Sequence, residues 1–200
     1  MKEISVNNNS FAGEIIGITK EDENLLIILN QKVQGVFNTA VALFIKKDLV
    51  KGFLKEFNPK QGETLLIINS YLYEKNDIIR MKVDSLDQII KKTSSQLNSF
   101  NITGEVTNIV EEETGGKTLF IYQKVGGAIP TKYEISVSKQ IVSTQKGMQD
   151  LQVHDSIYVT NGILYTKDGT VKIRVSRPSD IMQVPKCYNL GSCSAEEKFI

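Results

Sequence analysis

The sequence predicts a mainly β protein made of two tandem five-stranded barrels, each with a short helix between its third and fourth strands. Three observations lead to this prediction. Segments of the first half recur in the second half at a nearly constant separation. Apolar and polar residues alternate in most of these segments, as in strands with one buried face, and one segment in each half breaks the alternation. The chain therefore reads as one β domain present twice.

The internal repeat extends over most of each half. A shared register over four separate segments is hard to obtain by chance, so we expect a duplicated domain. The domains are predicted at residues 1–92 and 93–185, followed by a flexible C-terminal tail at 186–200. Domains of this size can bury a core of their own, though with modest margins. The matching segments, 91 residues apart in the third pair and 92 in the others, are Gln31–Val33 with Gln123–Val125, Asn69–Tyr73 with Asn161–Tyr165, Ala12–Ile15 with Thr103–Val106, and Met81–Val83 with Ile173–Val175.

The strands are clearest in the second copy. Leu119 and Ile121 alternate with polar or aromatic neighbours, which indicates a strand whose apolar side chains face inward. Thr114–Gly116 predicts a turn before this strand, and the apolar residues of Tyr133–Val137 predict the next strand by the same alternation. The other strands of this copy are expected at about 102–110, 156–165 and 170–175, and those that close the first copy at about 64–73 and 78–83.

A helix is predicted at residues 48–57 of the first copy. Its apolar residues fall on one face, Asp48 is the expected N-cap, and Asn58–Pro59 ends the helix. The second copy breaks its strand pattern at the same place, within Ile141–Leu151. An order of three strands, a short helix and two strands fits the five-stranded OB barrel. A small SH3-like barrel is the alternative, but it normally lacks a helix of that size at that place.

Composition limits the classes of function. The formal net charge is +1, so any nucleic-acid binding must come from local patches. No apolar run approaches the roughly 18 residues of a membrane-spanning helix, and Met1–Ser5 lacks the apolar stretch of a secretion signal. The only two cysteines, Cys187 and Cys193, lie in the last segment, so no disulfide is expected to hold the folded halves together. We expect a cytoplasmic protein without membrane contact.

No catalytic, metal or cofactor site is expected. The chain has no glycine-rich phosphate loop, no nucleophile with a base at motif spacing and no cluster of metal ligands. Two cysteines without a nearby histidine are too few for a zinc site. His154 is the only histidine, and it occupies the turn position that Gly62 holds in the first copy. We therefore predict that the protein is not an enzyme and needs no cofactor.

Several segments resemble the bacterial single-stranded-DNA-binding proteins. Val153–Leu164 is similar to the fourth strand of that family, where a Gly-Asp pair enters a strand of alternating valines ending in Glu-Gly-Arg-Leu. Gln61–Asn69 gives the same frame in the first copy, Tyr133–Val137 resembles the family's third strand, and Val175–Val184 resembles its closing segment. The resemblance implies an OB fold and non-enzymatic, largely sequence-independent binding of single-stranded DNA in replication, recombination or repair.

The chain also departs from that family. The family usually carries one barrel per chain and assembles into oligomers, whereas two barrels are fused here, as in some phage-type binders. Its stacking residues are often tryptophan, which this chain lacks. A homo-oligomer is still implied as one form of the protein. Abundant Asn, Lys and Ile suggest an AT-rich genome, so a low-GC bacterium or its phage or plasmid is the expected source.

The predicted DNA-binding residues are aromatic side chains for base stacking and cations for phosphate contacts. Each base stacked on an aromatic platform contributes about 1–3 kcal/mol, without any reading of sequence. Two aromatic rings on the outward side of the second strand in copy two would be unusual if that strand only packed; packing against the other barrel or the tail is the alternative. The stacking candidates are Phe120, Tyr122, Tyr158, Tyr165, Phe37, Tyr71 and Tyr73. The phosphate candidates are Lys124, Lys132, Lys167, Lys172, Arg174, Lys32, Lys75, Arg80 and Lys82.

The first copy lacks aromatic rings at the positions that match Phe120 and Tyr122. Ile28 stands there, and Val41 and Leu43 are expected to face outward on the third strand, which would make this face apolar. Contact with another protein is therefore the first alternative function: an OB-fold interaction module of a replication or mobile-element complex. Binding of single-stranded RNA is the second alternative, because OB barrels serve both nucleic acids.

The turns between the first two strands of each copy are acidic. Glu21–Glu23 and Glu111–Glu113 would repel a phosphate chain, which argues against nucleic-acid binding unless these turns bend away.

The predicted tail ends in acidic residues followed by an apolar pair. This end resembles the tip through which the family recruits replication and repair enzymes, although Lys198 departs from that pattern. The residues predicted to dock such partner proteins are Glu196, Glu197, Phe199 and Ile200.

Overall fold

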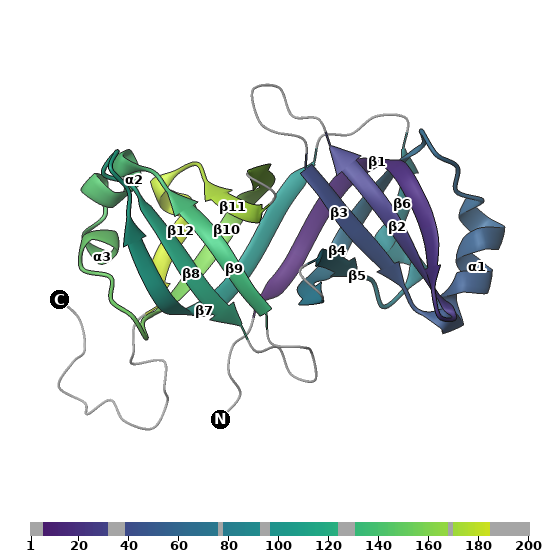
Figure 1. The fold of residues 1–200 in the computed structure, drawn as a ribbon, viewed down its shortest axis with the longest axis horizontal. Helices are drawn as coiled ribbons and strands as arrows, with labels where there is room; N and C mark the ends of the chain where they lie inside the picture. The colour runs from purple at the N-terminus through teal and green to yellow at the C-terminus, as the bar shows by residue number, and fades with distance from the viewer. Residues whose placement is uncertain are drawn as a thin grey trace.

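The computed structural model describes residues 6–31, 39–75, 78–92, 97–123, 131–167 and 170–184. Twelve strands form one continuous sheet that curls into two lobes (Figure 1). The predicted stacking residue Phe37, the phosphate candidates Lys32 and Lys124, and the tail with its four docking residues and both cysteines lie outside the described residues. Within the described ranges, no helix has the length and apolar character needed to cross a membrane.

In both halves three strands, a helical segment and two strands follow one another, as predicted, and a 3-10 helix and a short further strand come after them. The first half contains β1 (Asn7–Glu21), β2 (Asn24–Gln31), β3 (Thr39–Ile45), α1 (Lys47–Phe57), β4 (Thr64–Lys75), β5 (Ile78–Lys82), the 3-10 helix η1 (Leu86–Gln88) and β6 (Ile89–Lys92). The second half contains β7 (Asn98–Glu111), β8 (Lys117–Gln123), β9 (Thr131–Val137), α2 (Lys139–Thr144), α3 (Lys146–Gln149), β10 (Ser156–Lys167), β11 (Thr170–Val175), the 3-10 helix η2 (Pro178–Asp180) and β12 (Ile181–Val184).

Pairings beyond the linear strand order close each half on itself. The sheet runs β12-β10-β11-β9-β8-β7-β1-β2-β3-β5-β4-β6, and β1 also pairs with β4 while β7 also pairs with β10. The strands β1-β2-β3-β5-β4 and β7-β8-β9-β11-β10 therefore each form a ring. In both rings the third and fifth strands are parallel. The fold is mainly β and compatible with the OB fold.

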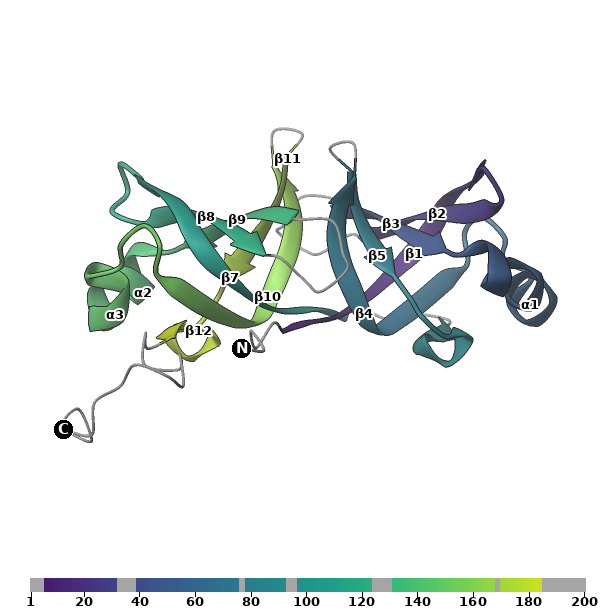
Figure 2. The same ribbon diagram turned by 90° about the horizontal axis from the view of Figure 1, so that it is seen from below.

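The expectation of two separate barrels needs a correction, because β1 pairs antiparallel with β7 and joins both rings into one sheet. The register runs from Asn7 opposite Ile102 to Phe11 opposite Asn98, so each half contributes the same stretch of its first strand. A contact that matches itself in this way has the geometry of a two-fold symmetric dimer interface within a single chain. The pairing of β1 with β7 is called the seam below. In Figure 2 the β4–β5 and β10–β11 hairpins rise on the same side of the seam.

A buried asparagine holds the first ring to the second at the seam. Asn7 donates hydrogen bonds to the Leu72 carbonyl at 2.7 Å and to Gln123 Oε1 at 2.9 Å. Its Oδ1 accepts one from the Leu72 N–H at 2.8 Å and another from the Asn9 side chain. The amide therefore satisfies the backbone of β4 and reaches across to β8 of the other half.

The second half repeats this arrangement from its own side. Asn98 is the counterpart of Asn7, and it donates to the Leu164 carbonyl and to Gln31 Oε1, both at 2.9 Å. It also accepts a hydrogen bond from the Leu164 N–H at 2.8 Å. The glutamines of the repeated Gln-Lys-Val segments thus serve the seam, which explains why both copies carry them.

The first asparagines of the repeated segments Asn69–Tyr73 and Asn161–Tyr165 shape the backbone of their strands. Asn69 and Asn161 both adopt φ of 51°, in the left-handed region that asparagine tolerates better than most residues. Each lies where the pairing of β4 with β1, or of β10 with β7, shifts its register. These bulges let the long strands β4 and β10 curve so that each ring can close.

The helices lie between the third and fourth strands of each ring, as expected. α1 buries Phe53 and Phe57, whose rings stack at 5.1 Å between centroids. Its N-cap is Lys46, not the expected Asp48, which lies in the first turn where a carboxylate is favoured by the helix dipole. In the second half the segment forms two shorter helices, because Gln145 has an extended backbone conformation and separates α2 from α3.

The predicted side-chain directions hold in the second half and fail on β3. Leu119, Ile121 and the apolar residues of Tyr133–Val137 are buried as expected. Val41 and Leu43 were expected to face outward, yet they are only 1% and 0% exposed and belong to the core. The alternation of β3 therefore places Ala40, Ala42 and Phe44 on the outer face instead.

Candidate nucleic-acid interface

The outer face of the second ring combines aromatic rings with cations. Phe120 and Tyr122 alternate with fully buried residues of β8, so both rings point outward, where they are half-buried. Across the β8–β9 pair, Phe120 lies opposite Glu134 and Tyr122 lies opposite the exposed Lys132. Lys172 of β11 is next to Glu134 and forms an ion pair with it at 2.7 Å. Rings and charges therefore share one strip across β8, β9 and β11.

Three of the predicted phosphate contacts in this half are exposed: Lys132, Lys167 and Arg174. Among the described residues, none of the three forms an ion pair. Lys167 ends β10 opposite Thr170, at the base of the predicted β10–β11 hairpin. This half therefore presents positive charge that is available to an anion.

The remaining two aromatic candidates of the second half do not belong to this strip. Tyr165 is 9% exposed, and its hydroxyl is 2.8 Å from the Ser136 hydroxyl, so the ring is covered and cannot serve as a platform in this conformation. Tyr158 is half-buried on β10, between Thr103 of β7 and Met182 of β12, away from β8. Outward alternation predicted the side of the strand on which each ring lies, but not what covers it.

In the first ring β2, the counterpart of β8, has no aromatic residue, and the rings near the surface come from β4 and β3. Tyr71 is 40% exposed on β4, and the Lys82 ammonium lies 6.0 Å from the centroid of its ring. Tyr73 meets Phe44 of β3 edge to face, with 6.5 Å between centroids and 85° between planes. Phe44 was missed by the sequence analysis. Subtracting 92 from the inward residues 133, 135 and 137 would have placed 41, 43 and 45 inward and Phe44 outward.

The cations of the first ring are engaged by carboxylates of the same half. Arg80 was expected to contact phosphate, but it is 3% exposed and is held by a hydrogen-bonded ion pair with Glu21. Lys75 also pairs with Glu21, at 3.1 Å. Burial would lower the pKa of Arg80, but the bond and charge of Glu21 outweigh it and raise that pKa overall. The expectation for Arg80 is corrected accordingly: its guanidinium already has an internal anion.

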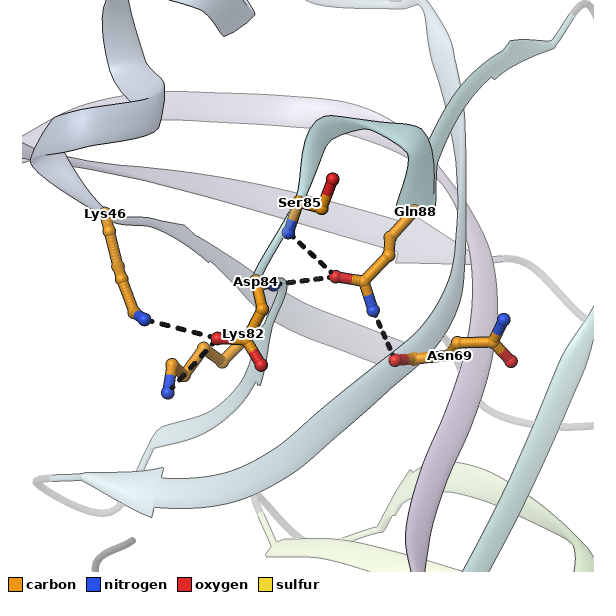
Figure 3. Close-up of polar contacts among 6 residues, drawn as sticks. All are labelled: Lys46, Asn69, Lys82, Asp84, Ser85 and Gln88. Carbon is orange, nitrogen blue, oxygen red and sulfur yellow. Dashed lines mark hydrogen bonds and ion pairs between the residues drawn. The ribbon is translucent and has the colours of Figure 1, made fainter. Parts of the chain in front are cut away.

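A second carboxylate neutralises the lysines at the other end of β5 (Figure 3). Asp84 lies 3.2 Å from the Lys46 ammonium and 3.5 Å from that of Lys82. The Gln88 side chain holds the backbone here, because its Oε1 accepts from the Asp84 and Ser85 N–H groups at 2.7 and 3.0 Å. Burial raises the pKa of Asp84, but the two lysines outweigh it, and the pKa is lowered overall.

The acidic turns are folded into the structure and are not simply solvated. Glu21 serves Arg80 and Lys75, and Glu23 pairs with Lys47 at the start of α1 at 3.0 Å. In the second half, Glu112 accepts a hydrogen bond from the Thr118 hydroxyl at 2.8 Å. In the first half, these ion pairs partly cancel the repulsion that the acidic turn would exert on a phosphate chain. The same pairs occupy cations that could otherwise have contacted the phosphates.

Acid is expected to destabilise the protein partly through Glu21. Its hydrogen bonds to Arg80 and then Lys75 lower its pKa, so the folded state holds this carboxylate ionised at pH values where the unfolded chain takes up a proton. Stability from this group is present above the unfolded pKa and is lost as pH falls through the folded one. Glu21→Gln should unfold at a lower temperature near neutral pH, and its melting temperature should then fall less on acidification than that of the wild type. The exposed Glu14→Gln is the control; equal acid sensitivity of both variants would contradict the assignment.

The described residues contain no group of three or more His, Cys, Asp or Glu placed to hold a metal ion. His154 has φ of 72° and Gly62 has φ of 89°, which confirms the predicted turn position in both halves. The His154 Nδ1 lies 2.7 Å from Glu105 on an exposed surface.

No protein-family model matches the chain, and no curated relative was found for it. Among solved structures, it is similar to a deletion mutant of the single-stranded DNA binding protein from Thermus aquaticus, with a TM-score of 0.64. The identity is 12%, over 96% of this chain and 98% of the other, so the similarity shows a shared fold alone. Weaker matches are the tetrameric p202 HIN2 (10% identity, 92% and 100% coverage, TM-score 0.35) and a murine DNA binding protein bound to double-stranded DNA (11%, 90% and 98%, 0.31). The last two scores are too low to support any inference.

Proposed function

We propose that this chain is a non-enzymatic protein of two tandem OB barrels that binds single-stranded DNA, with little dependence on base order, in replication, recombination or repair in the cytoplasm. One observation carries the proposal: Phe120 and Tyr122 point outward on β8, with the exposed Lys132 on the next strand. Aromatic faces beside cations suit unpaired bases, since every base can stack and every nucleotide brings a phosphate. The fold shared with a single-stranded DNA binding protein supports the same reading.

The second ring is proposed as the main binding surface. Its cations Lys132, Lys167 and Arg174 are exposed, whereas Arg80 and Lys82 of the first ring are engaged by Glu21 and Asp84. The first ring would add Tyr71, whose exposed face with the nearby Lys82 offers a secondary platform. The two outer faces lie on the same side of the molecule, where β8 and β9 and then β2 and β3 face the viewer in Figure 1. One strand could thus pass over both.

The test is a fluorescence-anisotropy titration with a single strand of about 30 nucleotides, long enough for two barrels, against a duplex of equal length. Binding to the single strand but not to the duplex is expected, and no binding to either at low salt would defeat the proposal. Competition between matched ribo- and deoxy-oligomers decides between RNA and DNA.

The salt dependence of that binding is expected to be shallow. Three exposed cations, Lys132, Lys167 and Arg174, would neutralise about three phosphates, which on a single strand gives a slope of log K against log salt of about −2. The slope is measured from titrations at several salt concentrations. Replacing Lys132 by Met should reduce the slope without abolishing binding, and a slope several-fold steeper would show that other cations form the site.

The alternative of a protein-interaction module loses its main support. The predicted apolar outer face of the first ring rested on Ile28, Val41 and Leu43, and two of these three belong to the core. Ala40, Ala42 and Phe44 lie on the outer side of β3 instead, so this face stays apolar, but it is made by other residues than those predicted.

A further inference from the structure

A pocket of about 380 Å³ lies between the two halves, beside the proposed binding strip. Residues of the β4–β5 hairpin of the first half form one wall. Residues of β8, β9 and β11 of the second half form the floor and the other wall. The lining residues are Glu74, Ile79, Phe120, Lys132, Tyr133, Glu134, Thr170 and Val171.

The pocket follows from the strand pairing and from the seam. The parallel pairing of β9 with β11 begins only at Glu134 opposite Lys172, so the first residues of β9 have no partner on β11. There β9 is held to the first half instead: the Tyr133 hydroxyl donates to the Leu72 carbonyl at 2.7 Å, and the Thr131 hydroxyl accepts from the Glu74 N–H at 3.4 Å. The hollow is therefore fixed by both halves together.

The chemistry of the lining is mixed. Phe120 supplies an aromatic ring, and the buried Ile79 and half-buried Val171 supply an apolar surface. Lys132 is exposed at the rim. Two carboxylates complete the lining, and they differ: Glu134 is paired with Lys172, whereas no cation of the described residues pairs with Glu74. The pocket therefore offers a stacking face, one cation and one free anionic acceptor.

We infer that this pocket holds one unpaired nucleotide of the bound strand and favours a base with an exocyclic amino group, such as cytosine or adenine. This inference rests on the proposed function and refines it: binding stays indifferent to base order but not to base composition. The base stacks on Phe120, its amino group donates to the Glu74 carboxylate, and the adjacent phosphate meets Lys132. Thymine carries a carbonyl oxygen where cytosine carries the amino group, so the carboxylate would repel it.

The first half does not repeat this chemistry. The residues 92 positions before Phe120, Lys132 and Glu134 are Ile28, Ala40 and Ala42, and the residue 92 positions after Glu74 is Thr166. The symmetric location thus lacks the ring, the cation and the carboxylates. Among the described residues, only the pocket lined by Glu74 and Phe120 combines the groups needed to distinguish bases in this way.

The experiment compares oligo-dC with oligo-dT of equal length near neutral pH by anisotropy titration, for the wild type, Glu74→Ala and Glu113→Ala. Glu113 is exposed in the β7–β8 turn outside the pocket, so its variant makes the same charge change as a control. The wild type and the control should bind oligo-dC about tenfold more tightly than oligo-dT, as expected for one hydrogen bond to a charged acceptor. Glu74→Ala should bring the two affinities together, mainly by weakening the oligo-dC complex.

The possible outcomes separate the two proposals. Equal binding of oligo-dC and oligo-dT by the wild type, or a preference that survives in Glu74→Ala, overturns the pocket while single-strand binding stands. No binding to any oligomer overturns the proposed function and the pocket with it. A circular-dichroism melt of each variant establishes that the comparison is made between folded proteins.

Discussion

The double variant Phe120→Ala/Tyr122→Ala is expected to bind single-stranded DNA at least about 30-fold more weakly than the wild type. Each stacked base contributes about 1–3 kcal/mol, so two lost platforms remove about 2 kcal/mol or more. The two rings are half-buried on the outer face of β8. The neighbouring core residues of the same strand, Leu119 and Ile121, are unchanged in this variant. Anisotropy titration gives the change in affinity, and thermal unfolding should show that the fold persists.

The repeat supplies a matched control for that variant. Ile28 and Asn30 stand 92 residues before Phe120 and Tyr122, on β2, and both are half-buried in the same orientation. Ile28→Ala/Asn30→Ala therefore removes side chains from the same place in the other ring without removing an aromatic platform. Its affinity should stay close to that of the wild type. Equal losses in both double variants would mean that stacking on β8 is not the basis of binding.

Asn7→Ala is expected to lower the free energy of unfolding by about 2–4 kcal/mol, because several buried groups lose their partners at once. Asn7 is 7% exposed and bonds the Leu72 N–H and carbonyl, Gln123 and Asn9. Alanine cannot replace any of these bonds. Urea unfolding monitored by circular dichroism gives the measurement.

Asn8, the residue next to Asn7, provides the control variant for the stability of the seam. Asn8 is exposed on the same strand, and Asn8→Ala should change stability by no more than about 0.5 kcal/mol. Because the seam ties both rings together, the wild type should unfold in one transition, with coincident curves from different probes. Similar stabilities of the two variants would show that the amide network contributes little.

Much of the fold could be predicted because the core residues alternate and the repeat confirms their register. The seam could not. The first strand of the second copy was expected to begin at about residue 102, yet β7 starts at Asn98. Asn98–Asn101 has one apolar residue, Phe100, among three polar ones and lacks the alternation of a strand, so it reads as a connection. The side-chain amides of Asn98 and Asn101 are satisfied by backbone and glutamine partners 60 or more residues away in sequence, which local pattern cannot reveal.

The site was predictable only in part, for a similar reason. The alternation of apolar and polar residues correctly placed Phe120 and Tyr122 on the outer face. The prediction failed for Val41 because the register of the repeat was not applied to β3. Arg80 and Tyr165 also lie on the outer side, but Glu21 of β1 and Ser136 of β9 engage them there. Whether an outward side chain is free depends on neighbours from other strands, and the sequence of one strand contains no information on them.

Ring closure has a consequence for the behaviour of this protein at high local concentration. In the described part of the chain only β6 and β12 end the sheet, and each is four residues long. Exposed lysines, Lys91 and Lys92, occupy the end of β6. Unpaired strand edges are the usual template for polymerisation into fibrils, and short or charged edges oppose it. High local concentration should therefore not drive these molecules into aggregates.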